Sequence, residues 1–292
     1  MKAVADEASL IVDLDFGPFA DLNASASSPT GAVVDETSKH VGQAVLSYTP
    51  AGSRLIFEAG KMYSHMDVET AKSKDNLNYS RSTLFSYGIP FWHTGIHIAY
   101  DVIPSELQTG IYIYNGWNSI YATNSSKTIG TQIRFTPAKD TAFTYNFIGG
   151  QGRPDSESDW KLVNELSASV PFYERHLMIA DFIYGTEDGA TQGTSKVRAE
   201  WYGGILGARF QLNEKSYISP RIEFYRDGNG ATLVGPSQTL NGITLTYGRT
   251  MASNLKARVE ARTDLSNEAT FVSEKGFSKS QSTILVAALF HF

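Results

Sequence analysis

The last twelve residues, QSTILVAALFHF, alternate apolar side chains with a period of two. A β-strand turns residues of one parity to the same face, so the following residues form one continuous apolar row: Ile284, Val286, Ala288, Phe290 and Phe292. Such a row needs an apolar covering, and the free edge of its strand needs a partner. We therefore expect the closing strand of a membrane-spanning β-barrel, whose outer face lies in lipid.

The aromatic end of this strand resembles the assembly signal of bacterial outer-membrane barrels. The resemblance implies that Phe290 and Phe292 are assembly signals recognised by the barrel-assembly machinery, and that outer-membrane lipid and lipopolysaccharide surround the protein. The first residues, MKAVADEAS, lack the apolar core of a secretory signal peptide. We expect that a leader has been removed from this chain and that the protein lies in the bacterial outer membrane.

Composition excludes several other classes of protein. The chain has 292 residues, a formal net charge of −5 and no cysteine. It therefore has no disulfide framework, no thiol nucleophile and no cysteine-based zinc site. The negative charge argues against a nucleic-acid partner. No stretch reaches the roughly 18 consecutive apolar residues that a membrane-spanning helix needs.

Segments of alternating hydrophobicity recur along the whole chain and predict about 14 strands of roughly 8–12 residues. Short turns (TPAGS, IPSEL, TPAKD, PFYERH, NEKS and RTMASN) alternate with long polar loops, including 62–91, 115–127, 185–196 and 226–238. Short periplasmic turns and long external loops are typical of transmembrane barrels. The predicted fold is all-β: one transmembrane antiparallel up-and-down β-barrel domain spanning 1–292, with both termini periplasmic.

Strand 255–262 shows the pattern most clearly, because Lys256, Arg258, Glu260 and Arg262 share the face opposite Leu255, Ala257, Val259 and Ala261. Four charges in a dry core would carry a large desolvation cost, so we expect this face to meet water. The same parity argument predicts a pore lining of Glu58, His97, Asp101, Arg134, Glu165, Arg209, Arg221, Glu223, Lys256, Arg258, Glu260 and Arg262, and it places Tyr112, Tyr114, Asn146 and Asp181 on the same lumenal face. These charges could be paired across strands or segregated by sign, and the sequence leaves both arrangements open.

A soluble β-sandwich or lipocalin-like barrel would show a similar alternation. Three features favour the membrane barrel: long strands, consistently long alternate loops, and aromatic residues near strand ends. The predicted aromatic girdles comprise Phe16, Tyr48, Phe135, Trp160, Tyr184, Tyr202, Phe210, Tyr217, Tyr247, Phe290 and Phe292.

One segment carries a more specific resemblance. It contains N-x-N-Y-S-R-S at 76–82 and I-P-F-x-H-T-G at 89–95, preceded by G-K-x-Y from Gly60. This arrangement is similar to that of the OmpL-like β-barrel porin family, also called β-barrel porin-2. The resemblance implies an outer-membrane pore with an inserted loop. We expect 62–91 to form a constriction with Arg81, Pro90 and His93; alternatively, Arg81 and His93 only pin the loop to the wall.

No catalytic or metal motif is visible. The chain has six histidines but no GxSxG elbow and no HExxH site. DSESD (155–159) and DGNG (227–230) could hold a cation, but we expect solvated loops. We therefore predict no enzyme, no cofactor and no metal; a barrel-embedded hydrolase is the weaker alternative.

The predicted function is a porin, a passive diffusion channel for small hydrophilic solutes and ions. The competing interpretation is a non-conducting barrel that displays its loops to a partner or surface. A homo-oligomer is compatible with either.

Overall fold

The computed structural model describes residues 2–4, 6–21, 38–66, 68–122, 126–151, 158–173, 175–192, 195–233, 235–274 and 276–290. The chain forms two compact units, which are described separately. Unit 1 contains Met1–Met66, Pro90–Pro137 and Thr144–Asn164, and unit 2 contains Asp67–Ile89, Ala138–Phe143 and Glu165–Phe292. The single domain over 1–292 stays a prediction.

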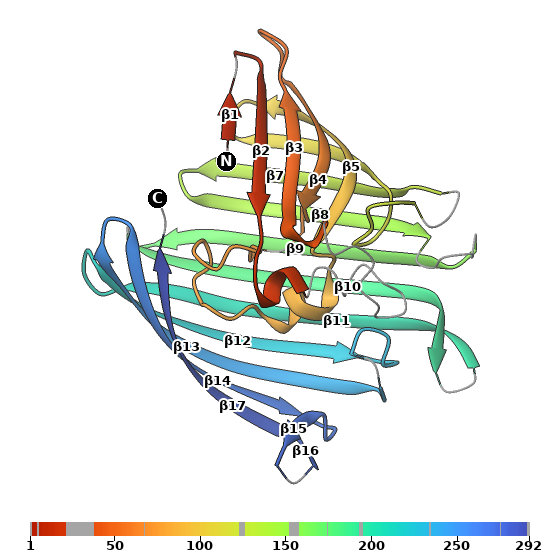
Figure 1. The fold of residues 1–292 in the computed structure, drawn as a ribbon, viewed down its shortest axis with the longest axis vertical. Coiled ribbons are helices and arrows are strands. Elements are labelled where there is room, and N and C mark those ends of the chain that lie inside the picture. The colour runs from red at the N-terminus through yellow and green to blue at the C-terminus, as the bar shows by residue number, and fades with distance from the viewer. Residues whose placement is uncertain are drawn as a thin grey trace. The chain divides into compact units, whose positions relative to one another are not determined.

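The chain is built almost entirely of antiparallel strands (Figure 1). Hydrogen-bonded order follows chain order from β1 to β14 and then β17, and a separate small sheet pairs β15 with β16. The strands are β1 (Lys2–Val4), β2 (Ala8–Leu14), β3 (Val41–Tyr48), β4 (Leu55–Tyr63), β5 (Trp92–Ile103), β6 (Leu107–Tyr114), β7 (Thr128–Ala138), β8 (Thr141–Gln151), β9 (Trp160–Phe172), β10 (His176–Gln192), β11 (Ser195–Gln211), β12 (Ser216–Asp227), β13 (Gln238–Ala252), β14 (Leu255–Ser266), β15 (Phe271–Ser273), β16 (Gly276–Ser278) and β17 (Ser280–Phe290). The described helical turns with defined bounds include η1 (Ser38–His40) and the π-helical η2 (Leu84–Gly88). Among the described residues, no helix has the length and apolarity to cross a membrane.

The predicted succession of strands, short turns and long loops is confirmed, with one correction. Each of the six short turns joins two consecutive strands. The prediction of a loop over 185–196 is wrong, because β10 and β11 continue their ladder from Gly185↔Trp201 to Gln192↔Ser195, with a bulge between Glu187 and Ala190. This stretch is rich in Gly, Thr and Ala, so it lacks the apolar alternation that marks a strand, yet its backbone still pairs.

The faces of the strands in unit 2 are inverted relative to a soluble protein. On β13, Ile243 is 63% exposed while the neighbouring Thr244 is fully buried. On β14, Val259 is exposed, whereas Arg258 and Glu260 are only 3% and 2% exposed. A soluble sandwich would bury the apolar face instead. The inversion matches strands that turn their apolar face to lipid.

Most predicted girdle aromatics are exposed as expected, including Phe16, Trp160 and Phe290. Tyr217 is the exception, because it shares the parity of Arg221 and its hydroxyl donates to the Leu77 carbonyl at 3.2 Å. Phe292 lies outside the described residues, so its predicted role in assembly stays a prediction.

A single charged substitution can test whether lipid covers the exposed apolar row on β17. Ile284 is 81% exposed, and the adjacent Thr283 lies on the opposite face. Ile284→Arg should lower the free energy of unfolding from lipid vesicles by about 2–4 kcal/mol, the usual cost of a cation on the lipid face. The matched control Thr283→Arg should cost less than half as much. Equal costs would show that lipid does not cover the Ile284 row.

Candidate functional site

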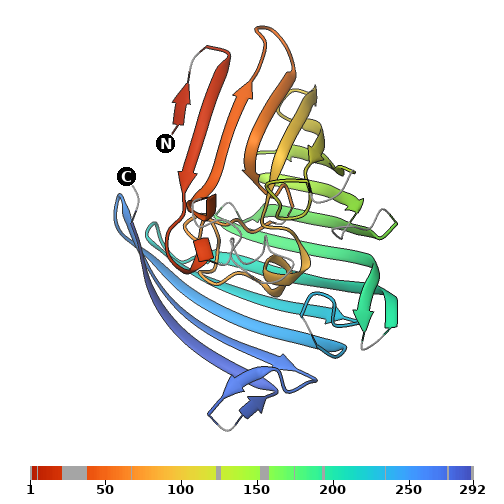
Figure 2. The same cartoon turned by 45° about the vertical axis from the view of Figure 1, so that its right-hand side comes forward.

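The inserted segment, residues 68–89, belongs to unit 2 (Figure 2) and contacts strands β11–β14. Most of it has no regular secondary structure, and only η2 near its end is helical. Its backbone N–H and C=O groups therefore need partners from elsewhere, because a buried unpaired amide is costly. Charged side chains of β12 and β14 supply them.

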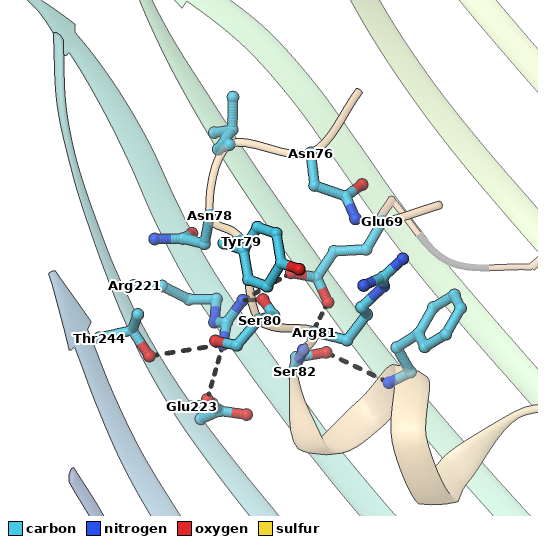
Figure 3. A network of polar contacts seen from close by, with 12 residues as sticks. Glu69, Asn76, Asn78, Tyr79, Ser80, Arg81, Ser82, Arg221, Glu223 and Thr244 are labelled. Atoms are coloured by element: carbon cyan, nitrogen blue, oxygen red, sulfur yellow. Dashed lines mark hydrogen bonds and ion pairs between the residues drawn. The ribbon is translucent and has the colours of Figure 1, made fainter. Parts of the chain in front are cut away.

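Arg221 on β12 is the centre of this arrangement and is fully buried (Figure 3). Its Nη1 donates to the Glu69 carboxylate and to the Ser80 carbonyl, both at 2.7 Å. Its Nη2 lies 3.2 Å from Glu223 Oε1 and 3.4 Å from Thr244 Oγ1. One guanidinium thus joins the inserted segment to two strands.

Carboxylates of the strands accept from the backbone amides of the segment. Glu260 accepts from the N–H groups of Tyr79 at 2.7 Å and Ser80 at 3.0 Å. Glu223 accepts from both the N–H and the hydroxyl of Thr83, at 2.5 Å and 2.8 Å. Each carboxylate therefore replaces the backbone acceptors that a strand partner would have offered.

Guanidinium groups of β14 donate to the segment's carbonyls. Arg258 reaches the carbonyl oxygens of Ser73 and Asn76, both at 2.6 Å, and that of Asn78 at 3.2 Å. Arg262 donates to the Arg81 carbonyl at 2.6 Å. The segment is therefore bound through its main chain along most of its length.

The polar residues of the N-x-N-Y-S-R-S motif complete the attachment. Asn78 donates from Nδ2 to the Ser219 carbonyl at 3.0 Å and to Thr246 Oγ1 at 2.7 Å. Asn76 closes a turn with Thr70 through two hydrogen bonds of 2.8 Å. The motif thus encodes the shape of the segment and its fit to β12 and β13.

The end of the segment is apolar. Leu84, Phe85 and Gly88 of η2 are buried, and Trp201 Nε1 donates to the Gly88 carbonyl at 3.0 Å. A Cβ added to Gly88 would lie 2.1 Å from Ile183 Cδ1, so a larger residue here would require the Ile183 side chain on β10 to move. Packing at η2 and charge pairing at 69–83 hold opposite ends of the same segment.

The expectation that the β14 charges meet water is wrong for Arg258 and Glu260. The inserted segment covers both side chains and replaces water with main-chain partners and opposite charges. The charges here are also paired rather than segregated, since Arg262 contacts Glu223 at 3.1 Å and Asp264 at 2.8 Å.

In unit 1, the polar face carries a stack of aromatic rings. His97 stacks on Tyr112 with centroids 4.0 Å apart and contacts Glu58 through Nδ1 at 2.8 Å. His93 stacks on Tyr114 at 3.9 Å. The prediction that His93 belongs to the loop is wrong: β5 begins at Trp92, so His93 is a buried residue of the strand.

The other two predicted loop residues have different surroundings. Arg81 bonds within its own segment, to Ser73 Oγ at 2.7 Å and to the Ala71 carbonyl. Pro90 is buried immediately before β5. A role in permeation stays a prediction for both.

The remaining predicted pore residues divide by exposure. Arg134 is exposed beside Asp101 in a pocket of about 170 Å³ at the β5–β6 turn. Arg209 and Lys256 are partly exposed. Glu165 is buried next to Asp181, which the parity argument also placed on the lumenal face. Their role in lining a pore stays a prediction.

Sequence reasoning missed Glu69, Asp264 and Asn118. Glu69 lies in a polar loop with no periodicity, and no pattern distinguishes it from a solvated residue. Asp264 continues the parity of Arg262 and could have been found by extending the strand. Asn118 accepts from the Phe91 amide at 2.7 Å, a contact that only the fold reveals.

The DGNG sequence forms a closed turn. The Asp227 carboxylate accepts from the backbone amides of Ala231, Thr232 and Leu233 at 3.1, 2.8 and 2.9 Å. Its oxygens are therefore already engaged by amides. Within the described ranges, no group of three or more His, Asp or Glu residues could hold a metal ion. Most of the DSESD sequence lies outside those ranges.

Known protein families and solved structures with similar sequences or folds agree with this architecture. The family model "Putative beta-barrel porin-2, OmpL-like" matches residues 2–292. The chain belongs to this family. It is an outer-membrane β-barrel of the porin type, and both the predicted family and the predicted location are confirmed. Family membership favours a channel over an enzyme. No curated protein matches significantly.

Solved structures show the same fold at low sequence identity. The outer membrane channel DcaP of Acinetobacter baumannii is 14% identical, with a TM-score of 0.68 over 99% of this chain and 82% of that one. OmpF of Salmonella typhi is 12% identical, with a TM-score of 0.64 and coverages of 99% and 88%. A trimer form of OmpT from Vibrio cholerae is 11% identical, with a TM-score of 0.58 and coverages of 99% and 88%.

Removing the central guanidinium should destabilise unit 2. Arg221→Met removes the guanidinium that binds Glu69 and one of the two that contact Glu223. Because both carboxylates are buried, we expect the free energy of unfolding in detergent to fall by about 3–5 kcal/mol. Lys256→Met is the matched control on β14, and it should cost less than about 1 kcal/mol because no described residue forms an ion pair with Lys256. Urea titration followed by tryptophan fluorescence measures both. Equal losses would contradict the central role of Arg221.

The buried position of His65, which lies just beyond β4, predicts that the stability of the folded protein depends on pH. Its ring stacks on Tyr112 with centroids 4.2 Å apart, and desolvation by the surrounding protein lowers its pKa to about 4. The pKa of His65 in the folded protein lies below the unfolded value of about 6.5. The contribution of His65 to the free energy of unfolding is therefore complete above pH 6.5 and is lost as the pH falls to 4. His65→Gln should remove roughly 3 kcal/mol of pH-dependent stability across this window. An unchanged pH profile would show that His65 is not desolvated.

Proposed function

We propose that this porin is a passive diffusion channel for small hydrophilic solutes and ions, narrowed by the inserted segment. The observation that carries the proposal is the main-chain attachment of residues 73–83 to Arg221, Arg258 and Glu260. A segment bound by charged side chains along its backbone keeps one position. It therefore acts as a permanent constriction rather than as a mobile lid.

Further support comes from polar residues that the segment leaves uncovered. Arg134 is exposed, and Arg209 and Lys256 are partly exposed on the faces opposite the apolar rows. Basic side chains that keep their water can act on a passing ion, because charges within about 10 Å remain coupled at physiological salt.

The second candidate is a non-conducting barrel that presents its loops to a partner. The exclusion of water where the segment contacts β12 favours the non-conducting barrel. Arg221 and Glu223 are almost completely buried, so this part of the polar face offers no path for water. The two candidates differ in whether water continues past the segment.

Planar-bilayer recordings distinguish these candidates. The diffusion pore predicts steady conductance from the purified protein, and a larger conductance after residues 70–87 are replaced by a short Gly-Ser linker. The replacement exposes the β12 and β14 charges to water, so the variant should still insert. If neither protein conducts, although protease protection verifies that both have inserted, the result supports the non-conducting barrel.

Selectivity tests the basic lining. Arg258 and Arg262 hold the segment, so reversing their charge would also displace it. Lys256→Glu together with Arg209→Glu avoids this problem and should shift the reversal potential in a salt gradient towards cations. Arg226→Glu, on the apolar side of β12, is the control and should not change it. An identical shift in the control would refute the predicted lining.

Partners remain at the level of prediction. The trimer form of the OmpT neighbour supports a homo-oligomer for this chain. We also expect lipopolysaccharide and the assembly machinery as partners; the exposure of Phe290 at the end of β17 supports its role as an assembly signal.

A further inference from the structure

A pocket of about 310 Å³ lies between the inserted segment and β13, β14 and β17, wholly within unit 2. Its size is at the lower end of small-molecule sites, which span roughly 300–1,000 Å³. Two cross-strand pairs contribute to its wall, Arg262↔Thr283 and Asp264↔Gln281. The lining also includes Tyr87 from the segment.

The charged groups of this pocket already have partners. Arg262 binds both Asp264 oxygens through Nε at 2.9 Å, while Nη1 donates to the Arg81 carbonyl. Glu260 accepts from Tyr79 and Ser80 amides. Arg81, the other basic residue of the lining, binds Ser73 Oγ and the Ala71 carbonyl. An anion would therefore find both guanidinium groups already engaged, and a cation would find both carboxylates engaged.

Uncharged polar groups are left for a ligand. Among the described residues, the Gln281 amide and the Thr283 hydroxyl have no hydrogen-bond partner, and both residues are exposed. An amide and a hydroxyl can each donate and accept. Beside them lie apolar and aromatic surfaces from Leu285, Phe271 and Tyr87, and Tyr87 is 46% exposed.

We propose that this pocket is a binding subsite for a neutral, hydroxyl-rich solute of about monosaccharide size. Such a molecule presents hydroxyl groups to Gln281 and Thr283 and its C–H face to Tyr87 and Leu285. The inference rests on the proposed function, because the subsite would lie on the path of a permeating solute. Its affinity is weak enough to release the solute, in the millimolar range.

The test is the block of single-channel current by D-glucose in the full-length protein. Each variant is compared with its own sugar-free current. Glucose should reduce the wild-type current along a saturating curve. Gln281→Leu combined with Thr283→Val should raise the half-blocking concentration about tenfold, the effect of losing one or two hydrogen bonds. Tyr87→Ala should also raise it, and Tyr121→Ala, an exposed tyrosine of unit 1, should not.

Other outcomes overturn the proposal in distinct ways. Conductance without saturable block, or block that the variants leave unchanged, refutes the subsite while the pore stands. Succinate blocking as strongly as glucose, with the same sensitivity to the variants, refutes the neutral class of ligand. If the protein does not conduct, equilibrium dialysis of radiolabelled glucose against detergent-folded protein decides the pocket alone. Binding lost in the double variant supports it, and no binding refutes it.

Discussion

The backbone of the inserted segment is the constraint on which the rest of the site depends. An irregular chain buried against a sheet must find a partner for each buried N–H and C=O group. Here the donors and acceptors are charged side chains: Glu223 and Glu260 accept from amides, and Arg221 and Arg258 donate to carbonyls. Hydrogen bonds to charged groups are worth about 1.5–3 kcal/mol each, more than neutral ones.

The segment also removes these charges from water, which is costly unless the segment supplies partners in return. Arg221 and Glu223 are buried, and a buried ion pair is stable only when its remaining hydrogen-bonding atoms are also satisfied. The segment and the charge cluster therefore stabilise each other. In the proposed channel, these main-chain contacts would fix the position of the constriction, and side chains at its edges such as Gln281 and Tyr87 would select the solute.

The sequence predicts the fold well because a membrane strand carries a period-two signal. The exposure of Ile243 and Val259, and the position of all six short turns, follow from that alternation. The stretch 185–192 was missed because its small residues carry no such signal. The prediction that Arg258 meets water was also wrong, because the parity of a residue identifies the face of the strand but not what covers that face. The role of Glu69 depends on a contact across 152 residues of sequence to Arg221, which no local pattern contains.

Backbone hydrogen exchange in detergent micelles tests the central claim most directly. Main-chain attachment predicts that the amides of Tyr79, Ser80 and Thr83 exchange slowly, far more slowly than those of Ala51 and Gly52 in the β3–β4 turn. Glu260→Gln should speed exchange at Tyr79 and Ser80 more than at Thr83. Exchange in the wild-type segment as fast as in that turn would contradict the account.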